Sequence, residues 1–183
     1  MAEWSNVPDS KSGVGASLPW VRIPPSPPVS WKPRMLLLIT FIFNTLIALL
    51  TIVFHYEILY KLNSAMPVIK HIHARYKVLI AVGVIFFAHI IEIWIFALAY
   101  YLMLKFPNLG SVIGAASDHG LLLDSAYLSF VTYTTVGYGD IVVDGYLRYL
   151  TGIEALTGLI LITWSASFLF IEMQKYWGSQ SSN

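Results

Sequence analysis

The sequence predicts an all-α membrane protein with three transmembrane helices, and with a short re-entrant helix and a loop between the second and the third. Of the 183 residues, 57% are hydrophobic and only 11% are charged, a composition too apolar for a soluble domain. Three apolar runs reach the roughly 20 helical residues that cross a bilayer. Aromatic side chains gather at the ends of these runs, where amphipathic rings favour the headgroup region.

Composition also excludes several classes of function. The chain has no cysteine, so disulfide frameworks, thiol catalysis and thiolate metal sites are ruled out. A formal net charge of +1 gives no reason to expect a nucleic-acid partner. The few acids and histidines show neither a metal-ligand spacing nor a nucleophile beside a base. We therefore expect a protein that is not an enzyme and that needs no organic cofactor.

The first 60 residues divide into a tail and a helix. Residues 1–33 are polar and contain the run PPSPP at 24–28, which favours an extended conformation, so we expect a flexible tail. This tail lacks the apolar core of a secretory signal and is expected to stay in the mature protein. The apolar run 35–54 predicts a first transmembrane helix within residues 34–60.

Residues 61–77 predict a basic cytoplasmic linker. Four basic residues stand there without an acid, namely Lys61, Lys70, Arg75 and Lys77. Short loops rich in lysine and arginine stay in the cytoplasm. Three crossings then place the N-terminus outside and the C-terminus inside a multi-pass plasma-membrane protein, although two basic residues just before the first helix count against this orientation.

Hydropathy divides the rest of the chain into a second transmembrane helix, an outer loop, a short helix, a third transmembrane helix and a short cytoplasmic tail: residues 78–104, 105–123, 124–134, 147–173 and 174–183. The short helix is apolar and aromatic, and Asp124 and Ser125 can cap its start. Eleven residues cannot span a bilayer. A helix that enters the membrane and returns is tolerated only where its backbone is buried or faces water.

The sequence Thr-Thr-Val-Gly-Tyr-Gly-Asp follows this helix at residues 134–140. A dehydrated cation is held by a cage of oxygens, which strands supply when their successive carbonyls face one side and several copies meet on an axis. Gly137 and Gly139 suit this geometry because glycine enters positive φ at little steric cost. Val136 and Tyr138 are then expected to point away from the axis.

Over these seven residues, and in the order of the segments around them, the chain resembles the potassium-channel family of bacterial type with one pore loop. The resemblance covers residues 78–173, as outer helix, pore helix, filter (135–140) and inner helix, and leaves an extra N-terminal transmembrane helix. It implies that K⁺ is bound along the filter by Thr135, Val136, Gly137 and Tyr138, followed by Gly139. One filter strand per chain implies a homotetramer. The expected partners are three identical subunits, K⁺ and the lipid bilayer.

The resemblance also gives supporting roles to residues beside the filter. Tyr127 stands where the family often has tryptophan, and its hydroxyl is placed to hydrogen-bond Asp140. Thr134 begins the motif, and we expect all three residues to support the filter. The competing interpretation is that Tyr127 is packed there with its hydroxyl on any partner.

Two acids lie inside the predicted spans, Glu92 and Glu154, and ionisable groups in a membrane are usually paired or functional. Glu92 and His89 are three residues apart on one helical face, which allows them to pair. We expect both acids to support the filter by bracing the pore helix through Ser129 or Thr132. A proton relay is the alternative.

The third span carries a candidate hinge and a candidate gate. Gly158 matches the glycine at which inner helices of the family bend, and close helix packing is the competing explanation. Ile162, Ala166 and Phe170 follow at helical spacing and are expected to face the cavity. The bulk of Phe170 makes it a candidate gate at the inner mouth.

Two observations bear on gating. The run 35–54 contains no lysine or arginine, so it is not the charged helix of a voltage sensor. His71 and His73 in the basic linker are candidates for pH sensing, because histidine changes its charge near neutral pH. Two interfacial histidines without a sensing role are the competing interpretation.

Two other functions are weighed against a potassium channel: a non-conducting regulatory or scaffold subunit, and a weakly selective cation channel. The intact run of residues 135–139 speaks against the first, because a silent subunit has no need of these glycines. Tyr138 speaks against the second, because the resemblance implies that weakly selective channels depart from this run.

Overall fold

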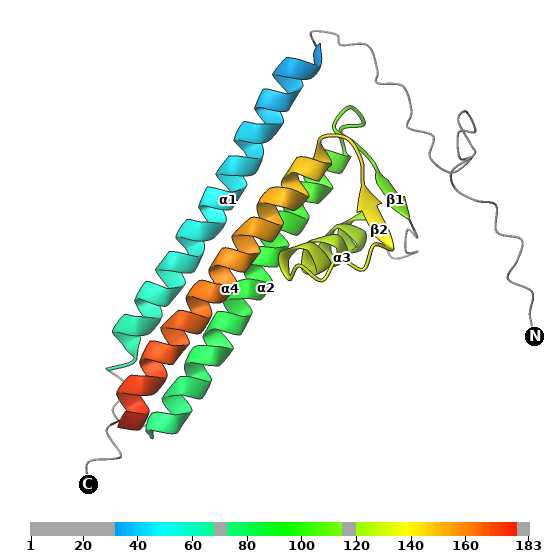
Figure 1. Ribbon diagram of the computed structural model, residues 1–183. Helices are drawn as coiled ribbons and strands as arrows, with labels where there is room; N and C mark the ends of the chain where they lie inside the picture. The colour runs from blue at the N-terminus through cyan, green and yellow to red at the C-terminus, as the bar shows by residue number, and fades with distance from the viewer. Residues whose placement is uncertain (1–31, 68–72, 115–119, 179–183) are drawn as a thin grey trace, which may run out of the picture. The chain divides into compact units, whose positions relative to one another are not determined.

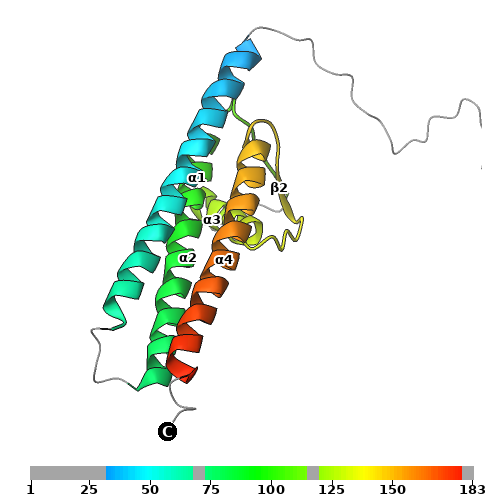
Figure 2. The same cartoon turned by 60° about the vertical axis from the view of Figure 1, so that its left-hand side comes forward.

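The computed structural model describes residues 32–67, 73–114 and 120–178, and all structural statements refer to these. Three long helices run side by side, as both views show (Figures 1 and 2). They are α1 (Lys32–Ala65), α2 (Ala74–Leu104) and α4 (Leu147–Gly178). Each is long and apolar enough to cross a membrane. The expected mostly helical membrane fold is therefore confirmed.

Helix α1 is longer than the sequence predicted, and the linker after it is shorter. The helix continues to Ala65, and α2 already begins at Ala74, so both helices extend into the predicted linker 61–77. The extension is stabilised by packing, because Leu59 and Leu62 are buried in one cluster with residues of α2. The predicted tail 1–33 lies almost entirely outside the described residues.

Between α2 and α4 the chain forms a short helix, α3 (Leu121–Tyr133), which contacts both long helices (Figure 1). The sequence placed its start at residue 124, with Asp124 and Ser125 as caps, and this was wrong. The N-cap is Gly120, Asp124 lies in the first turn, and the Ser125 hydroxyl donates back to the Leu121 carbonyl at 2.7 Å. Leu121 and its neighbours continue the helix because leucine is a strong helix former.

Two short strands were not predicted. Strand β1 (Val112–Gly114) lies within the predicted outer loop, and β2 (Ile141–Val143) follows the predicted filter. They pair in antiparallel register, with Ile113 opposite Val142 (Figure 1). Ile141 and Val143 point into the core and Val142 points out. The hairpin therefore ties the end of the 135–140 segment to the connection that follows α2.

The main core lies where α2, α3, β2 and α4 meet. Its fully buried members include Phe96, Tyr100, Tyr133, Leu147 and Leu150. Many large apolar side chains on the outer faces of the long helices are exposed, as expected of surfaces that meet lipid or other chains.

Candidate functional site

Positive φ recurs at every second residue from Thr135 to Gly139. Thr135, Gly137 and Gly139 have φ of 59°, 51° and 79°, whereas Val136 and Tyr138 between them do not have positive φ. Positive φ at alternate positions allows neighbouring carbonyls to turn the same way, an arrangement that residues with side chains resist. Thr135 is the one described residue other than glycine with positive φ, a conformation that costs about 1–2 kcal/mol and that gathers at functional sites.

This segment is attached to the last turn of α3. The Thr135 N–H donates to the Thr132 carbonyl at 2.9 Å, and the Gly137 N–H donates to the Val131 carbonyl at 3.0 Å. The Thr134 hydroxyl donates to the Phe130 carbonyl at 2.7 Å. The carboxyl end of α3, which carries the negative end of the helix dipole, therefore leads directly into the segment.

The side chains of the segment are exposed in the single chain. Val136 is 54% exposed and Tyr138 is 73% exposed. Contiguous exposed apolar surface marks protein–protein or membrane contact sites, so these side chains are candidates for contact with another chain.

Tyr127 and Asp140 form the predicted contact. The Tyr127 hydroxyl donates to Asp140 Oδ2 at 2.7 Å, and Asp140 Oδ1 accepts the Ile141 N–H at 3.0 Å. The hydrogen bond to Asp140, together with desolvation and the negative charge, raises the pKa of the Tyr127 phenol, so the hydroxyl stays a donor. The contact joins the side of α3 to the end of the 135–140 segment.

Glu154 joins three helices. Its carboxyl group is fully buried and accepts a 2.6 Å hydrogen bond from Tyr100 of α2. It is also hydrogen-bonded to the Ser129 hydroxyl of α3, as the sequence predicted for the bracing acids. Ser129 lies 2.8 Å from the Ile93 carbonyl as well. A hydroxyl has one proton to donate, so it serves one of these two acceptors at a time.

Glu92 contacts α3 at a different residue from the one predicted. Its carboxylate accepts a 2.5 Å hydrogen bond from Tyr133, and the sequence had named Ser129 or Thr132. The expected pair with His89 is present, with His89 Nδ1 at 2.8 Å from Glu92 Oε2.

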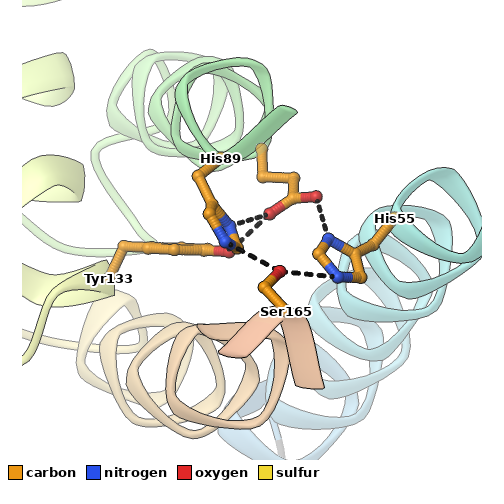
Figure 3. Close-up of polar contacts among 5 residues, drawn as sticks. His55, His89, Tyr133 and Ser165 are labelled. Atoms are coloured by element: carbon orange, nitrogen blue, oxygen red, sulfur yellow. Dashed lines mark hydrogen bonds and ion pairs between the residues drawn. The ribbon is translucent and has the colours of Figure 1, made fainter. Parts of the chain in front are cut away.

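Two further residues complete this cluster and were not predicted (Figure 3). His55 of α1 places Nδ1 at 2.8 Å from Glu92 Oε1. Ser165 of α4 lies 3.2 Å from His55 Nε2 and 3.1 Å from His89 Nε2. His55 stands at the end of an apolar run in the sequence, beside Tyr56 and Glu57, where it reads as an interfacial residue. Its full burial could have been found from helical spacing, because it shares one face of α1 with the buried Asn44 and Thr51.

His55, His89 and Glu92 bring three potential metal-binding groups within 4.8 Å of one another. Each of their ring nitrogens and carboxylate oxygens already has a protein partner. The arrangement is a closed hydrogen-bond cluster and leaves no open coordination position.

The remaining predicted residues are found as follows. A Cβ atom at Gly158 would lie 2.3 Å from the Tyr133 carbonyl oxygen, so α4 and α3 are in close contact there. Ile162, Ala166 and Phe170 are exposed in the single chain, whereas Ser165 is buried on another face of α4. His73 is exposed just before α2, and His71 lies outside the described residues.

Residues 88–175 match the family model described as ion channel. The matched segment covers a little under half of the chain and contains α3, the 135–140 segment and nearly all of α4. It supports an ion channel domain within a multi-pass membrane protein. No curated protein and no solved structure matches the chain significantly.

Proposed function

We propose that this chain is one subunit of a potassium-selective channel, and that residues 135–140 are its selectivity filter. The observation that carries the proposal is the alternation of φ through Thr135, Gly137 and Gly139 at the carboxyl end of α3. In the sequence TVGYG this backbone supplies a row of carbonyls on one side, within a segment that matches an ion channel family.

K⁺ ions in the filter are coordinated by the carbonyls of Thr135, Val136, Gly137 and Tyr138, with the Thr135 hydroxyl as a further ligand. These oxygens replace the hydration shell, so the cost of dehydrating the ion is offset. The negative end of the α3 dipole favours a cation just before the filter. Four side chains hold α3 and the filter in position relative to each other: Tyr127, Asp140, Glu92 and Glu154.

Four copies of the chain surround the pore. One strand leaves the ion coordinated on one side only, whereas four strands close the cage. The exposure of Val136 and Tyr138 in the single chain supports this assembly, because neighbouring subunits supply the missing cover. Native mass spectrometry of the purified protein is expected to give four chains. A stable monomer or dimer that conducts would contradict the proposal.

The inner part of the pore is lined by α4. Ile162, Ala166 and Phe170 are exposed in the single chain and face the cavity, with Phe170 narrowing its inner mouth. The chain lies in the plasma membrane with its N-terminus outside and its C-terminus in the cytoplasm, as the basic linker before α2 favours.

The test is potassium flux into liposomes that contain the purified protein, with sodium as the competing ion. Gly137→Ala is expected to abolish selective flux, because alanine at a φ of 51° is strained by about 1–2 kcal/mol in each subunit. Gly152→Ala is the matched control, since a Cβ at this glycine meets nothing within 4 Å and its φ is not positive. Equal potassium and sodium flux would instead favour a weakly selective channel. No flux at any pH or voltage would favour a non-conducting subunit.

A further inference from the structure

The cluster of His55, His89, Glu92, Tyr133 and Ser165 is the one place where side chains from α1, α2, α3 and α4 are seen to meet in a single hydrogen-bond network among the described residues (Figure 3). Apart from His89, with 18% of its side chain exposed, its members are buried. A buried polar network is stable only when each of its members is satisfied. Its protons can therefore be counted from its contacts.

Both histidines use both ring nitrogens. Each Nδ1 lies 2.8 Å from one oxygen of Glu92. His89 Nδ1 also lies 2.9 Å from the Tyr133 hydroxyl, which donates its one proton to Glu92 Oε2 and can accept on its oxygen. Each Nδ1 therefore carries a hydrogen that donates to the ionised carboxylate. Each Nε2 lies within 3.2 Å of the same Ser165 hydroxyl. A hydroxyl donates one hydrogen bond and accepts others. If both rings were neutral, Ser165 would satisfy one Nε2 and present a lone pair to the other.

One additional proton completes the network. With a proton on the second Nε2, Ser165 accepts from one ring and donates to the other, and every contact is satisfied. The number of satisfied contacts is the same when one Nδ1 proton moves to Glu92. The carboxyl group then donates to the Nδ1 that lost its hydrogen. In both arrangements the cluster is electrically neutral, which is the favourable state for a group buried in a membrane.

We propose that this cluster is an intramembrane proton-binding site that holds one exchangeable proton, and that the proton regulates ion flux by holding α4 against the other helices. The regulation rests on the channel function proposed above, whereas the proton count does not. Loss of the proton leaves a net negative charge in the cluster and removes one of the two contacts of Ser165.

The cluster lies close in the chain to the proposed filter and to the inner part of α4. Tyr133 is the last residue of α3 and stands two residues before Thr135. Ser165 lies about two helical turns beyond Gly158, where α4 touches the Tyr133 backbone. The Ser165 contacts therefore fix the part of α4 that contains Ile162 and leads to Phe170.

Every helix around the cluster contributes groups that face it, with His55 from α1 and His89 and Glu92 from α2. Helix α3 contributes Tyr133, and α4 contributes Ser165 and the indole of Trp164, whose ring centroid lies 5.7 Å from that of His55. The other buried acid nearby, Glu154, is bonded to Tyr100 and Ser129.

Two substitutions are expected to make ion flux independent of pH, one at the level of the protonated cluster and one at the level of the deprotonated cluster. In Glu92→Gln, the amide oxygen accepts from Tyr133 and His89 while its N–H donates to His55 Nδ1. His55 then donates from Nε2 to Ser165, so all contacts are made by two neutral rings and no exchangeable proton is needed. Ser165→Ala removes the link to α4 whether or not the proton is bound. The control is Ser167→Ala, whose exposed hydroxyl bonds only the Thr163 carbonyl of its own helix at 3.0 Å.

The experiment is potassium flux into liposomes from about pH 5 to about pH 9, an interval that brackets the ordinary pKa of histidine. The unsubstituted protein and Ser167→Ala are expected to show one transition, with plateaus that differ about fivefold or more, as one lost hydrogen bond shifts a two-state equilibrium. Glu92→Gln is expected to stay at the acidic plateau and Ser165→Ala at the alkaline plateau. Flat flux in the unsubstituted protein, or a transition retained in Ser165→Ala, would overturn the regulation.

A second readout counts the proton without conduction. The other three histidines are replaced by glutamine in protein labelled with ¹⁵N-histidine, at positions His71, His73 and His119. The proton is then followed as an imidazolium signal in the NMR spectrum or as a carboxylic acid band in the infrared spectrum that Glu92→Gln lacks. Release of one proton in a single step is expected. Two neutral rings beside a carboxylate at every pH would overturn the proton site, whereas a titrating cluster in a protein without any flux would leave the site intact and refute the channel function.

Discussion

Replacement of Gly158 by alanine distinguishes close packing from hinge bending in α4. An added Cβ would lie 2.3 Å from the Tyr133 carbonyl oxygen, where real Cβ atoms stay beyond about 3.0 Å. One of the two backbones must therefore move by at least about 0.7 Å, the difference of these distances. The obstacle is a main-chain carbonyl, so no side-chain rotation relieves it. Overpacking of this kind costs about 1–3 kcal/mol.

The matched control is Gly152→Ala in the same helix, where nothing lies within 4 Å of the added Cβ. Both variants gain about 1 kcal/mol of helix propensity, so the difference between them isolates the clash. We expect Gly158→Ala to be less stable than Gly152→Ala by about 1–3 kcal/mol, measured by denaturant unfolding in detergent and followed by circular dichroism. Equal stability, or a more stable Gly158→Ala protein, would refute the packing argument. If Gly158 acts only as a hinge, Gly158→Ala should be more stable and should show reduced flux.

Three further predictions concern the contacts around the filter. Tyr127→Phe removes the donor to Asp140, and its flux in liposomes is expected to decline faster with time than that of the unsubstituted protein. Because the pKa of Tyr127 is raised, the tyrosine keeps its proton up to its ordinary pKa of about 10 and loses it only as pH rises through the raised value. The difference between the two proteins should therefore not change from neutral pH to about pH 9. Equal rates of decline would contradict the prediction. Ser129→Ala is expected to lower the free energy of unfolding by about 1–3 kcal/mol, against about 0.5 kcal/mol or less for the exposed Ser167→Ala, and equal values would exclude the bracing contact. Glu154→Gln is expected to assemble normally because the amide can hydrogen-bond both Tyr100 and Ser129. Glu154→Ala leaves the Tyr100 hydroxyl without its acceptor and should lower the free energy of unfolding by about 1–3 kcal/mol in the same measurement. A Gln variant that fails to assemble would show that the charge itself is required.

Features with a local physical cause could be predicted from the sequence. Hydropathy alone locates three helices, because a bilayer sets one length for all of them. The pair of His89 and Glu92 follows from helical spacing, whereas the partner of Tyr127 was expected from the resemblance to the potassium-channel family.

Features that depend on distant packing could not be predicted. His55 and Glu92 are 37 residues apart in the sequence, so their contact has no local signal. Helical spacing does place Thr40, Asn44, Thr51 and His55 on one buried face of α1, but it does not indicate which residue that face contacts. Strands β1 and β2 have three residues each, too few for an alternating pattern to be recognised. The start of α3 was misplaced because Asp124 and Ser125 are good capping residues, while the chain uses Gly120.

The central claim is selective conduction through residues 135–140. The most direct test is the reversal potential of currents through the purified protein in a planar bilayer, with potassium on one side and sodium on the other. We predict a large reversal potential that follows the potassium gradient, because the carbonyls of Thr135 to Tyr138 replace the hydration shell of potassium. A reversal potential near zero, with currents equally large for sodium, would contradict the account.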